Sequence, residues 1–179
     1  MFLLQQLDQT LKKIKCQIAN SLTVINLSLG VFAILYVLQG ELRTSLLLIT
    51  LAAVFDRLDG SAARKFNIVS EFGKQLDSLT DIISFGVAPA LLLYHAVLFQ
   101  FGIAGSLFTV LFIACGAIRL ARFNVMESNH FFVGLPITAA GCILTLLYLL
   151  VPFLPAYLFM FITLVLSLLM ISTIRVRKM

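Results

Sequence analysis

The chain has 179 residues, of which 61% are hydrophobic and 12% are charged, and its mean hydropathy is +1.07. A soluble domain usually carries about 25% charged residues. The composition therefore excludes an ordinary soluble enzyme and predicts a membrane protein. The formal net charge is +5, and the distribution of the basic residues along the chain carries more information than their number.

The first 15 residues predict an amphipathic helix, because polar and apolar positions alternate there with a helical period. Such a helix is typical of a segment that lies in the membrane interface. The alternative is a solvated, frayed end of the chain. The apolar positions are Leu3, Leu4, Leu7, Leu11 and Ile14.

Six apolar runs follow, each close to the length of about 20 residues that crosses a bilayer as a helix. They cover residues 17–39, 44–63, 76–99, 102–121, 133–151 and 154–173. The fold class that we predict is an all-α integral membrane protein with six transmembrane helices and an N-terminal interfacial helix. Residues 1–179 would form one membrane domain, with the interfacial helix over 1–15 and the six-helix bundle over 16–179.

The basic residues predict the orientation of this bundle. With six spans, every Lys and Arg except Arg43 falls on one side of the membrane. The positive-inside rule then puts both chain termini on the cytoplasmic face of the cell (inner) membrane. The residues on that side are Lys12, Lys13, Lys15, Arg57, Arg64, Lys65, Lys74, Arg119, Arg122, Arg175, Arg177 and Lys178.

Four aspartates interrupt the apolar pattern, and they are half of the chain's eight acidic residues. Ionisable groups within a transmembrane pattern are costly and are usually functional. Asp56 and Asp59 are spaced to share one helix face, and Asp77 and Asp81 are spaced to share another. Carboxylates that converge from two helices need cations, so this pattern predicts a divalent-metal site on the cytoplasmic side.

The residues around the aspartates favour a site for a diphosphate. Gly60, Ala63 and Gly73 lack bulk, which allows a ligand to touch the backbone, and Arg64 offers donors that suit a phosphate. A metal-bridged diphosphate at a membrane surface indicates a nucleotide-activated lipid. The alternative is that the aspartates only form ion pairs at a wet helix end, with Arg57, Arg64, Lys65 and Lys74.

The pattern D-x-x-D-G-x-x-A-R-x8-G-x-x-x-D-x-x-x-D, which runs from Asp56 to Asp81, resembles the signature of the CDP-alcohol phosphotransferases at every fixed position. The six predicted helices also fit that family. The resemblance implies the transfer of a substituted phosphate from a CDP-linked donor to an alcohol, with release of CMP. It also implies a homodimer surrounded by membrane lipids, and no nucleic acid among the partners.

The resemblance assigns a role to each residue of the signature. Asp56, Asp59 and Asp77 would hold metal, and Asp81 would be the general base and also lie near the metal. The metal would be Mg²⁺ or Mn²⁺, with two ions bound. The CDP-lipid pocket would be formed by Asp56, Asp59, Gly60, Ala63, Arg64 and Gly73. Asn26, a polar residue in the first span, would either reach this pocket or bond a neighbouring helix.

Three short segments look like the membrane-integral phosphatidylserine synthases: S-F-G-V-A-P at 84–89, R-L-A-R-F-N at 119–124 and F-x-G-L-P-I at 132–137. This resemblance implies that CDP-diacylglycerol is the donor and L-serine the acceptor. Other members of the family would use a different alcohol, such as glycerol 3-phosphate or inositol. A divalent-cation transporter is a further alternative, although such sites usually lie near the midplane of the membrane.

Arg119, Arg122 and Asn124 are the candidates for binding serine. Either arginine could bind the serine carboxylate through charge-assisted hydrogen bonds, and Asn124 could bond its amino or carboxylate group. The alternative is that both arginines only contact lipid phosphates at the cytoplasmic surface.

Overall fold

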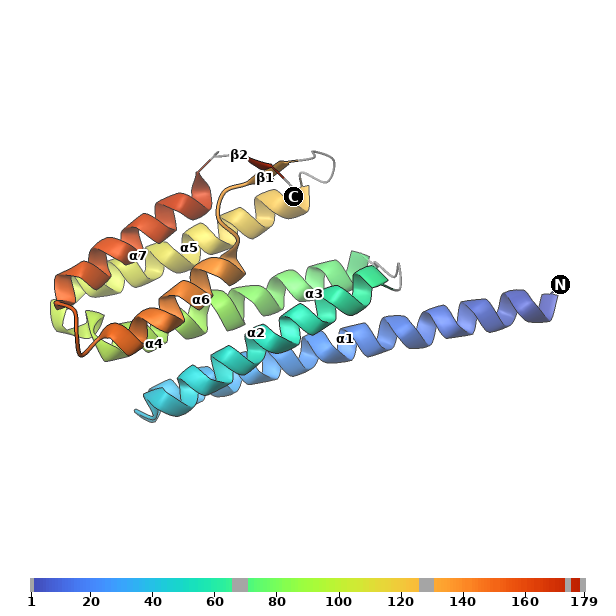
Figure 1. Cartoon of the computed structure of the whole chain (residues 1–179), viewed down its shortest axis with the longest axis horizontal. Helices are drawn as coiled ribbons and strands as arrows, with labels where there is room; N and C mark the ends of the chain where they lie inside the picture. Colours follow the sequence, from blue (N-terminus) through green and yellow to red (C-terminus); the bar gives the residue numbers. More distant parts are fainter. Residues whose placement is uncertain (1, 66–70, 126–130, 173–174, 178–179) are drawn as a thin grey trace.

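The computed structural model of the chain describes residues 2–65, 71–125, 131–172 and 175–177. Helices make up nearly all of this part of the chain (Figure 1). In chain order the elements are α1 (Phe2–Leu38), α2 (Leu42–Lys65), α3 (Glu71–Asp81), the π-helical segment η1 (Ile82–Val87), α4 (Ala88–Ala96), the 3₁₀ segment η2 (Leu98–Phe101), α5 (Ile103–Val125), β1 (Phe131–Val133), α6 (Ile137–Leu147), the 3₁₀ segment η3 (Tyr148–Leu150), α7 (Ala156–Ile171) and β2 (Arg175–Arg177).

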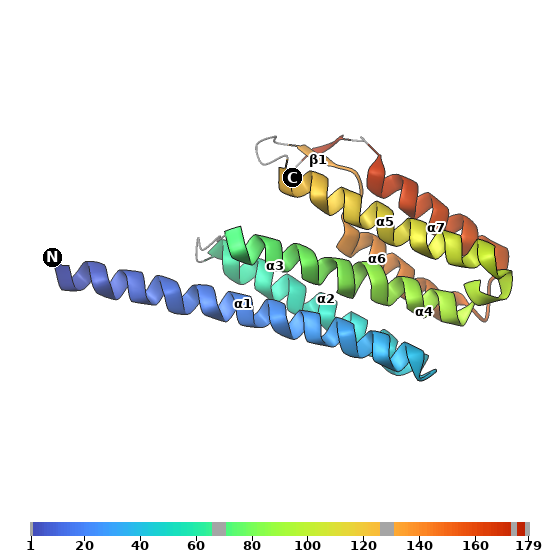
Figure 2. The same ribbon diagram turned by 180° about the vertical axis from the view of Figure 1, so that it is seen from behind.

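The helices form a bundle in which α3, η1 and α4 make one continuous central rod. α1 and α2 pack together on one side of this rod, and α5 and α7 pack together on the other (Figures 1 and 2). Ala88 and Leu92 of the rod belong to a buried cluster with α1 and α2. Phe85 and Leu93 belong to a second cluster with α5, α6 and α7. The central rod is therefore held on two faces by apolar packing.

Each of the six predicted apolar runs forms a helix, which confirms the prediction of a helical bundle. In the described part of the chain, three segments are long and apolar enough to cross a membrane: Asn20–Leu38, Glu71–Ala96 and Ile103–Val125. Ile137–Leu150 and Ala156–Ile171 are apolar but shorter. α2 carries charged residues near both ends, among them Arg43, Asp56 and Arg57.

α1 continues through residues 15 and 16, where the sequence predicted a boundary between an interfacial helix and the first span. The predicted N-terminal helix is thus the first part of a longer helix and not a separate element. This part of α1 extends beyond the ends of the neighbouring helices (Figures 1 and 2). Its position relative to a membrane remains a prediction.

A short antiparallel strand pair, which the sequence did not predict, closes one end of the bundle. β1 pairs with β2 in a register that puts Phe131 opposite Arg177 and Val133 opposite Arg175. After β1, Gly134 has a positive φ of 76°, and the Leu135 N–H donates to the Leu169 carbonyl of α7 at 3.1 Å. These contacts join the segment before α6 to the end of α7.

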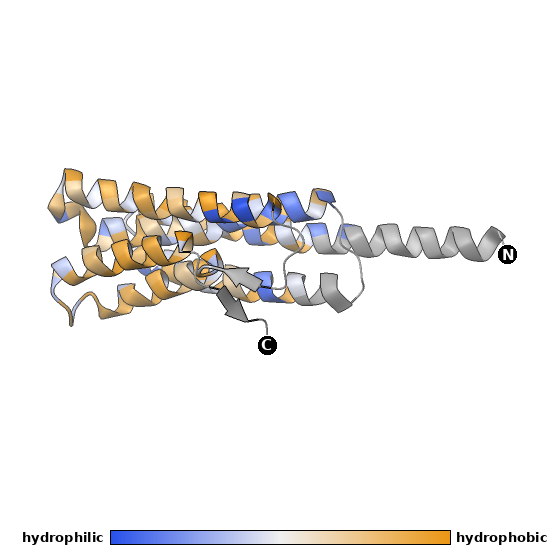
Figure 3. Cartoon of the chain, turned by 90° about the horizontal axis from the view of Figure 1, so that it is seen from above, coloured by the Kyte–Doolittle hydropathy of each residue, from blue (hydrophilic) through white to orange (hydrophobic). Residues whose placement is uncertain are grey.

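Polar residues gather toward one end of the bundle, while most residues in the rest of the coloured ribbon are hydrophobic (Figure 3). This end contains the C-terminal half of α2 and most of α3, so it brings the aspartates of both helices into one region. It is the part of the molecule in which the sequence predicted the chemistry.

Candidate active site

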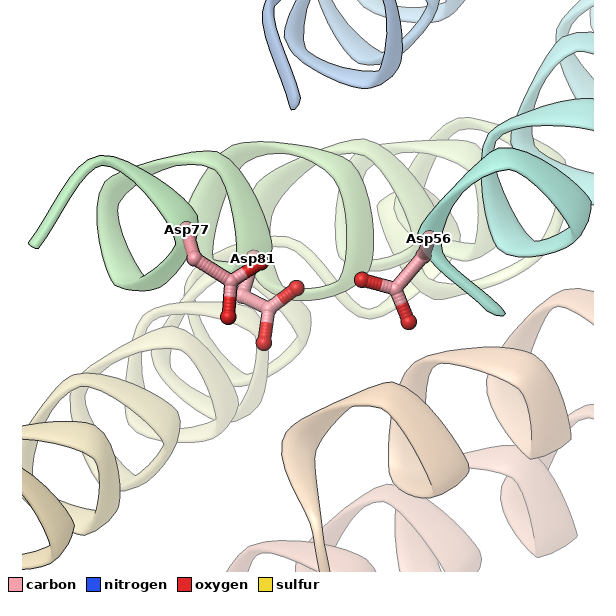
Figure 4. Close-up of side chains that lie close together, drawn as sticks. All are labelled: Asp56, Asp77 and Asp81. Atoms are coloured by element: carbon pink, nitrogen blue, oxygen red, sulfur yellow. The ribbon is translucent and has the colours of Figure 1, made fainter. Parts of the chain in front are cut away.

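Asp56, Asp77 and Asp81 come together between α2 and α3. Asp77 and Asp81 lie four residues apart on α3, so their side chains share a helix face. Asp56 approaches them from α2, and Figure 4 shows the three carboxylates gathered between the two helices. One oxygen from each carboxylate lies within 4.8 Å of the corresponding oxygens of the other two. The predicted convergence of carboxylates from two helices is therefore present for these three residues.

Three carboxylates at this separation repel one another strongly when ionised. At an effective dielectric constant of 20, two unit charges 4.8 Å apart repel by about 3 kcal/mol. Asp81 is buried, and its Oδ1 accepts no hydrogen bond from the residues that the structure describes. A cation between the carboxylates would remove the repulsion and also satisfy this buried oxygen.

The geometry of the cluster fits a divalent ion. Mg²⁺ binds oxygen at 2.0–2.1 Å, so two oxygens on one ion are separated by no more than about 4.2 Å. The observed limit of 4.8 Å exceeds this by about 0.6 Å, which side-chain rotation can close. Oxygen ligands from carboxylates are also the set that hard divalent cations prefer. The donor chemistry therefore fits Mg²⁺ or a similar ion.

The other residues of the signature surround this cluster in sequence. Gly60 follows Asp56 by four residues on α2, and Gly73 precedes Asp77 by four residues on α3. Each glycine thus lies about one helical turn from a carboxylate. The side chains of Asp59, Ala63 and Arg64 lie outside the described residues, so their predicted roles remain predictions.

Arg119 of α5 lies near the carboxylates. Its side chain is partly buried, and it is close enough to Asp81 for the two charges to attract each other. Its guanidinium carbon lies 5.7 Å from the ring centroid of Phe123. Within the described part of the chain, its buried Nε atom has no hydrogen-bond acceptor. Arg119 therefore combines a positive charge near the cluster with a donor that remains available.

Arg122 and Asn124, the other candidates for binding serine, contact neighbouring helices. Arg122 Nη1 donates to the Ile171 carbonyl at 3.2 Å, one of the carbonyls at the end of α7 that have no partner within the helix. Asn124 Nδ2 donates to Ser78 Oγ at 3.0 Å. Both residues therefore tie α5 to another helix. Ser78 lies beside Asp77 on α3, and no signal in the sequence indicated this pairing.

Asn26 is 1% exposed and belongs to α1. Its backbone carbonyl accepts a hydrogen bond from Ser84 Oγ at 3.2 Å, so α1 is joined to η1 at this point. Its Oδ1 atom has no partner among the described residues. The structure thus provides the helix contact that was one alternative for Asn26, but through its backbone. The role of its side chain in the CDP-lipid pocket remains a prediction.

A comparison of the chain with known protein families agrees with the fold and with the candidate site. The family profile described as CDP-alcohol phosphatidyltransferase matches residues 16–171, which include every helix from the apolar part of α1 to the end of α7. The chain belongs to the CDP-alcohol phosphatidyltransferase family. The resemblance predicted from the aspartate signature is thereby confirmed. Membership of this family and the three long apolar helices identify an integral membrane protein.

Several curated proteins are similar to this chain. It is 42% identical over 168 residues to the archaetidylserine synthase of Methanothermobacter thermautotrophicus, covering 91% of this chain and 71% of that protein. It is 40% identical over 134 residues to the CDP-diacylglycerol–serine O-phosphatidyltransferase of Helicobacter pylori, covering 73% and 56%. It is 38% identical over 127 residues to the enzyme of the same name from Bacillus subtilis, covering 70% and 72%.

Proposed function

We propose that this chain is a CDP-diacylglycerol–serine O-phosphatidyltransferase, which transfers the phosphatidyl group of CDP-diacylglycerol to the hydroxyl of L-serine and releases CMP. The observation that carries the proposal is the convergence of Asp56, Asp77 and Asp81 in a member of this family. The names of the similar proteins agree on serine, and they differ in the lipid. They favour serine over glycerol 3-phosphate or inositol as the acceptor.

The carboxylates would hold the divalent metal on which the reaction depends. Asp56, Asp77 and Asp81 would supply oxygen ligands, joined by Asp59 as the family signature implies, and two ions of Mg²⁺ or Mn²⁺ would be bound. When bound, such ions neutralise charge on the diphosphate and on the oxygens that enter and leave the phosphorus. The short separation of the three carboxylates supports this role.

Asp81 is the general base of the proposed reaction. It lies one helical turn, about 6 Å, beyond Asp77 toward the interior of the bundle, and it is buried. Its carboxylate accepts the proton of the serine hydroxyl as the serine oxygen attacks the lipid-side phosphorus. The new bond joins that oxygen to phosphorus, and the bond between phosphorus and the CMP oxygen breaks. CMP leaves with the bonding electron pair.

The CDP part of the donor would bind beside the carboxylates. Gly60 and Gly73 lack side chains one turn away from Asp56 and Asp77, which leaves the backbone accessible to a ligand. Ala63 and Arg64 continue the same end of α2, where an arginine suits a phosphate. Asn26 completes the proposed pocket from α1.

Arg119 is the residue that we propose for binding the serine carboxylate. It lies near Asp81, and its Nε donor is not used within the described residues. A bidentate pair with the serine carboxylate would employ that donor. Arg122 and Asn124 are weaker candidates because each already ties α5 to another helix. Arg119 would thus hold serine with its hydroxyl close to the general base.

The proposed location follows from the basic residues. The six helices would cross the cell (inner) membrane, with both termini and the carboxylates on the cytoplasmic side, where serine and metal ions are available. The first 15 residues would lie in the membrane interface. The chain would act as a single membrane domain, would form a homodimer as the family resemblance implies, and would contact membrane lipids.

The proposal is tested with a panel of acceptor alcohols. The purified chain in mixed micelles is given CDP-diacylglycerol, Mn²⁺ or Mg²⁺, and either L-serine, glycerol 3-phosphate or inositol, and released CMP is measured. We expect serine-dependent release that EDTA abolishes and added metal restores. Release with another alcohol but not with serine would assign a different acceptor. A chain that releases no CMP with any alcohol, but moves divalent cations across a vesicle membrane, would be a transporter.

A further inference from the structure

The central rod of the bundle changes its helix type immediately after Asp81. α3 ends at Asp81, and the next six residues, Ile82–Val87, form η1. At the end of η1 the Ala88 N–H donates to the Ile83 carbonyl, five residues earlier. A π-type turn of this kind is rare and occurs frequently at functional sites.

Pro89 explains why the wider turn forms here. Proline has no N–H, and its ring crowds the carbonyl four residues earlier, which in this chain belongs to Phe85. An α-helical bond to that carbonyl therefore cannot form. Pro89 lies in the first turn of α4 and is buried, so the helix must accommodate it within the packed core.

The backbone of η1 packs closely against two glycines, one on α1 and one on α6. A Cβ atom at Gly30 of α1 would lie 2.9 Å from Ser84 Cα, and one at Gly141 of α6 would lie 2.8 Å from Phe85 Cβ. Both separations are too short for real atoms, so any side chain would push the backbone of η1 away. Together with the hydrogen bond from Ser84 Oγ to the Asn26 carbonyl, these contacts fix η1 between α1 and α6.

The wide turn determines which way the carboxylates face. An α-helical residue turns the chain by about 100°, and a π turn contains one residue more than an α turn. Replacing η1 by a regular α-helix would therefore rotate α3 relative to α4 by about that angle. The rotation of α4 is fixed, because Leu92 packs against α1 and α2 while Leu93 packs in the other cluster. The rotation would therefore turn α3, and with it Asp77 and Asp81, away from Asp56.

We propose that η1 is a positioning device that turns Asp77 and Asp81 toward Asp56, with Pro89, Gly30 and Gly141 as its positioning residues. If η1 is changed, the predicted loss of metal binding follows from the position of the carboxylates alone, whatever reaction the chain catalyses. The effect on lipid transfer rests on the proposed function. The two consequences can be measured separately in the full-length protein.

The test compares the binding of Mn²⁺, measured from the EPR signal of the free ion, among variants of the full chain in detergent. Pro89→Ala restores the missing N–H without changing the chain length, so a regular α-helix could replace η1 and rotate α3. Gly141→Ala adds the Cβ that would displace Phe85. The matched control is Gly86→Ala, whose added Cβ would lie at an ordinary 3.4 Å from Ile137 Cδ1. Asp77→Asn gives the loss expected when one ligand is removed.

We expect Mn²⁺ affinity to fall by about ten-fold or more in Gly141→Ala, and less in Pro89→Ala. Gly86→Ala should bind as the parent does. Helix content and gel-filtration profile identify variants that fold. Unchanged Mn²⁺ affinity in folded Gly141→Ala and Pro89→Ala would overturn the proposal. A parent chain that binds Mn²⁺ but transfers no lipid would refute the proposed function alone, and the affinities would still test η1.

Discussion

Asp81 is buried and lies one turn beyond Asp77 on α3, whereas Asp56 is partly buried and approaches from α2. The three carboxylates thus have different surroundings although they share one cluster. Asp81 is also the residue near Arg119, the proposed site for the acceptor carboxylate. This position would let Asp81 contact the acceptor as well as the metal, which is why we propose proton transfer as its role.

Asp81→Asn should separate proton transfer from donor binding. The amide keeps the size of the side chain but cannot serve as the base, so we expect turnover to fall by about 100-fold or more. Binding of CDP-diacylglycerol in the presence of Mn²⁺ should be reduced much less. Glu71→Gln, at the exposed start of the same helix, is the matched control and should retain turnover. Full turnover in Asp81→Asn would refute this assignment.

Arg119 and Arg122 provide a second comparison at the residue scale. Arg119→Gln should raise the KM for serine by roughly ten-fold or more, because a charged hydrogen-bond partner of the carboxylate is lost. Arg122→Gln should leave that KM nearly unchanged and lower thermal stability, since its bond to the Ile171 carbonyl is lost. Steady-state kinetics at varied serine and a thermal unfolding curve measure both effects. The reverse pattern of KM values would assign the acceptor site to Arg122.

At the scale of elements, the sequence predicted the six helices because long apolar runs and short connections leave few alternatives. It also predicted that Asp56 would meet Asp77 and Asp81, because their spacing on two helices brings them to one end. It did not predict η1, which depends on how Pro89, Gly30 and Gly141 pack in three dimensions. The strand pair was missed because strands of three residues carry no periodic signal.

Gly134 and Gly40 allow a test of how the strand segment is joined to α7. Both have positive φ, but a Cβ at Gly134 would lie 2.6 Å from the Met170 carbonyl oxygen, whereas one at Gly40 meets nothing within 4 Å. Gly40→Ala should cost about 1 kcal/mol from backbone strain alone. Gly134→Ala should cost about 2 kcal/mol or more, because a clash is added. Thermal unfolding in detergent measures both, and equal losses would show that the contact with α7 is unimportant.

At the scale of the whole molecule, hydrophilic residues gather toward one end of a bundle whose remaining coloured ribbon is mostly hydrophobic (Figure 3), and the carboxylate cluster lies between α2 and α3. This arrangement suits an enzyme that draws its lipid substrate from the membrane and its polar substrates from the cytoplasm. The proposed orientation gives opposite accessibility to two described positions: Glu71 at the start of α3, and Gly102 in the turn before α5.

Single cysteines at these two positions test the orientation. In a chain whose native Cys16, Cys115 and Cys142 have been replaced, Gly102→Cys should react with a membrane-impermeant maleimide in right-side-out vesicles. Glu71→Cys should react only after the vesicles are opened or inverted, because positively charged connections remain on the cytoplasmic side. Labelling is read as a mass shift on a gel. The opposite pattern would put the carboxylates outside the cell.

The most direct test of the proposed function measures two products of one reaction. The purified chain is incubated with CDP-diacylglycerol, Mn²⁺ and isotopically labelled L-serine, and CMP and labelled phosphatidylserine are quantified from the same samples over time. Transfer to the serine hydroxyl predicts equal molar amounts of the two products, with neither formed after EDTA treatment. CMP that accumulates without phosphatidylserine, whether serine is present or absent, would contradict the assignment.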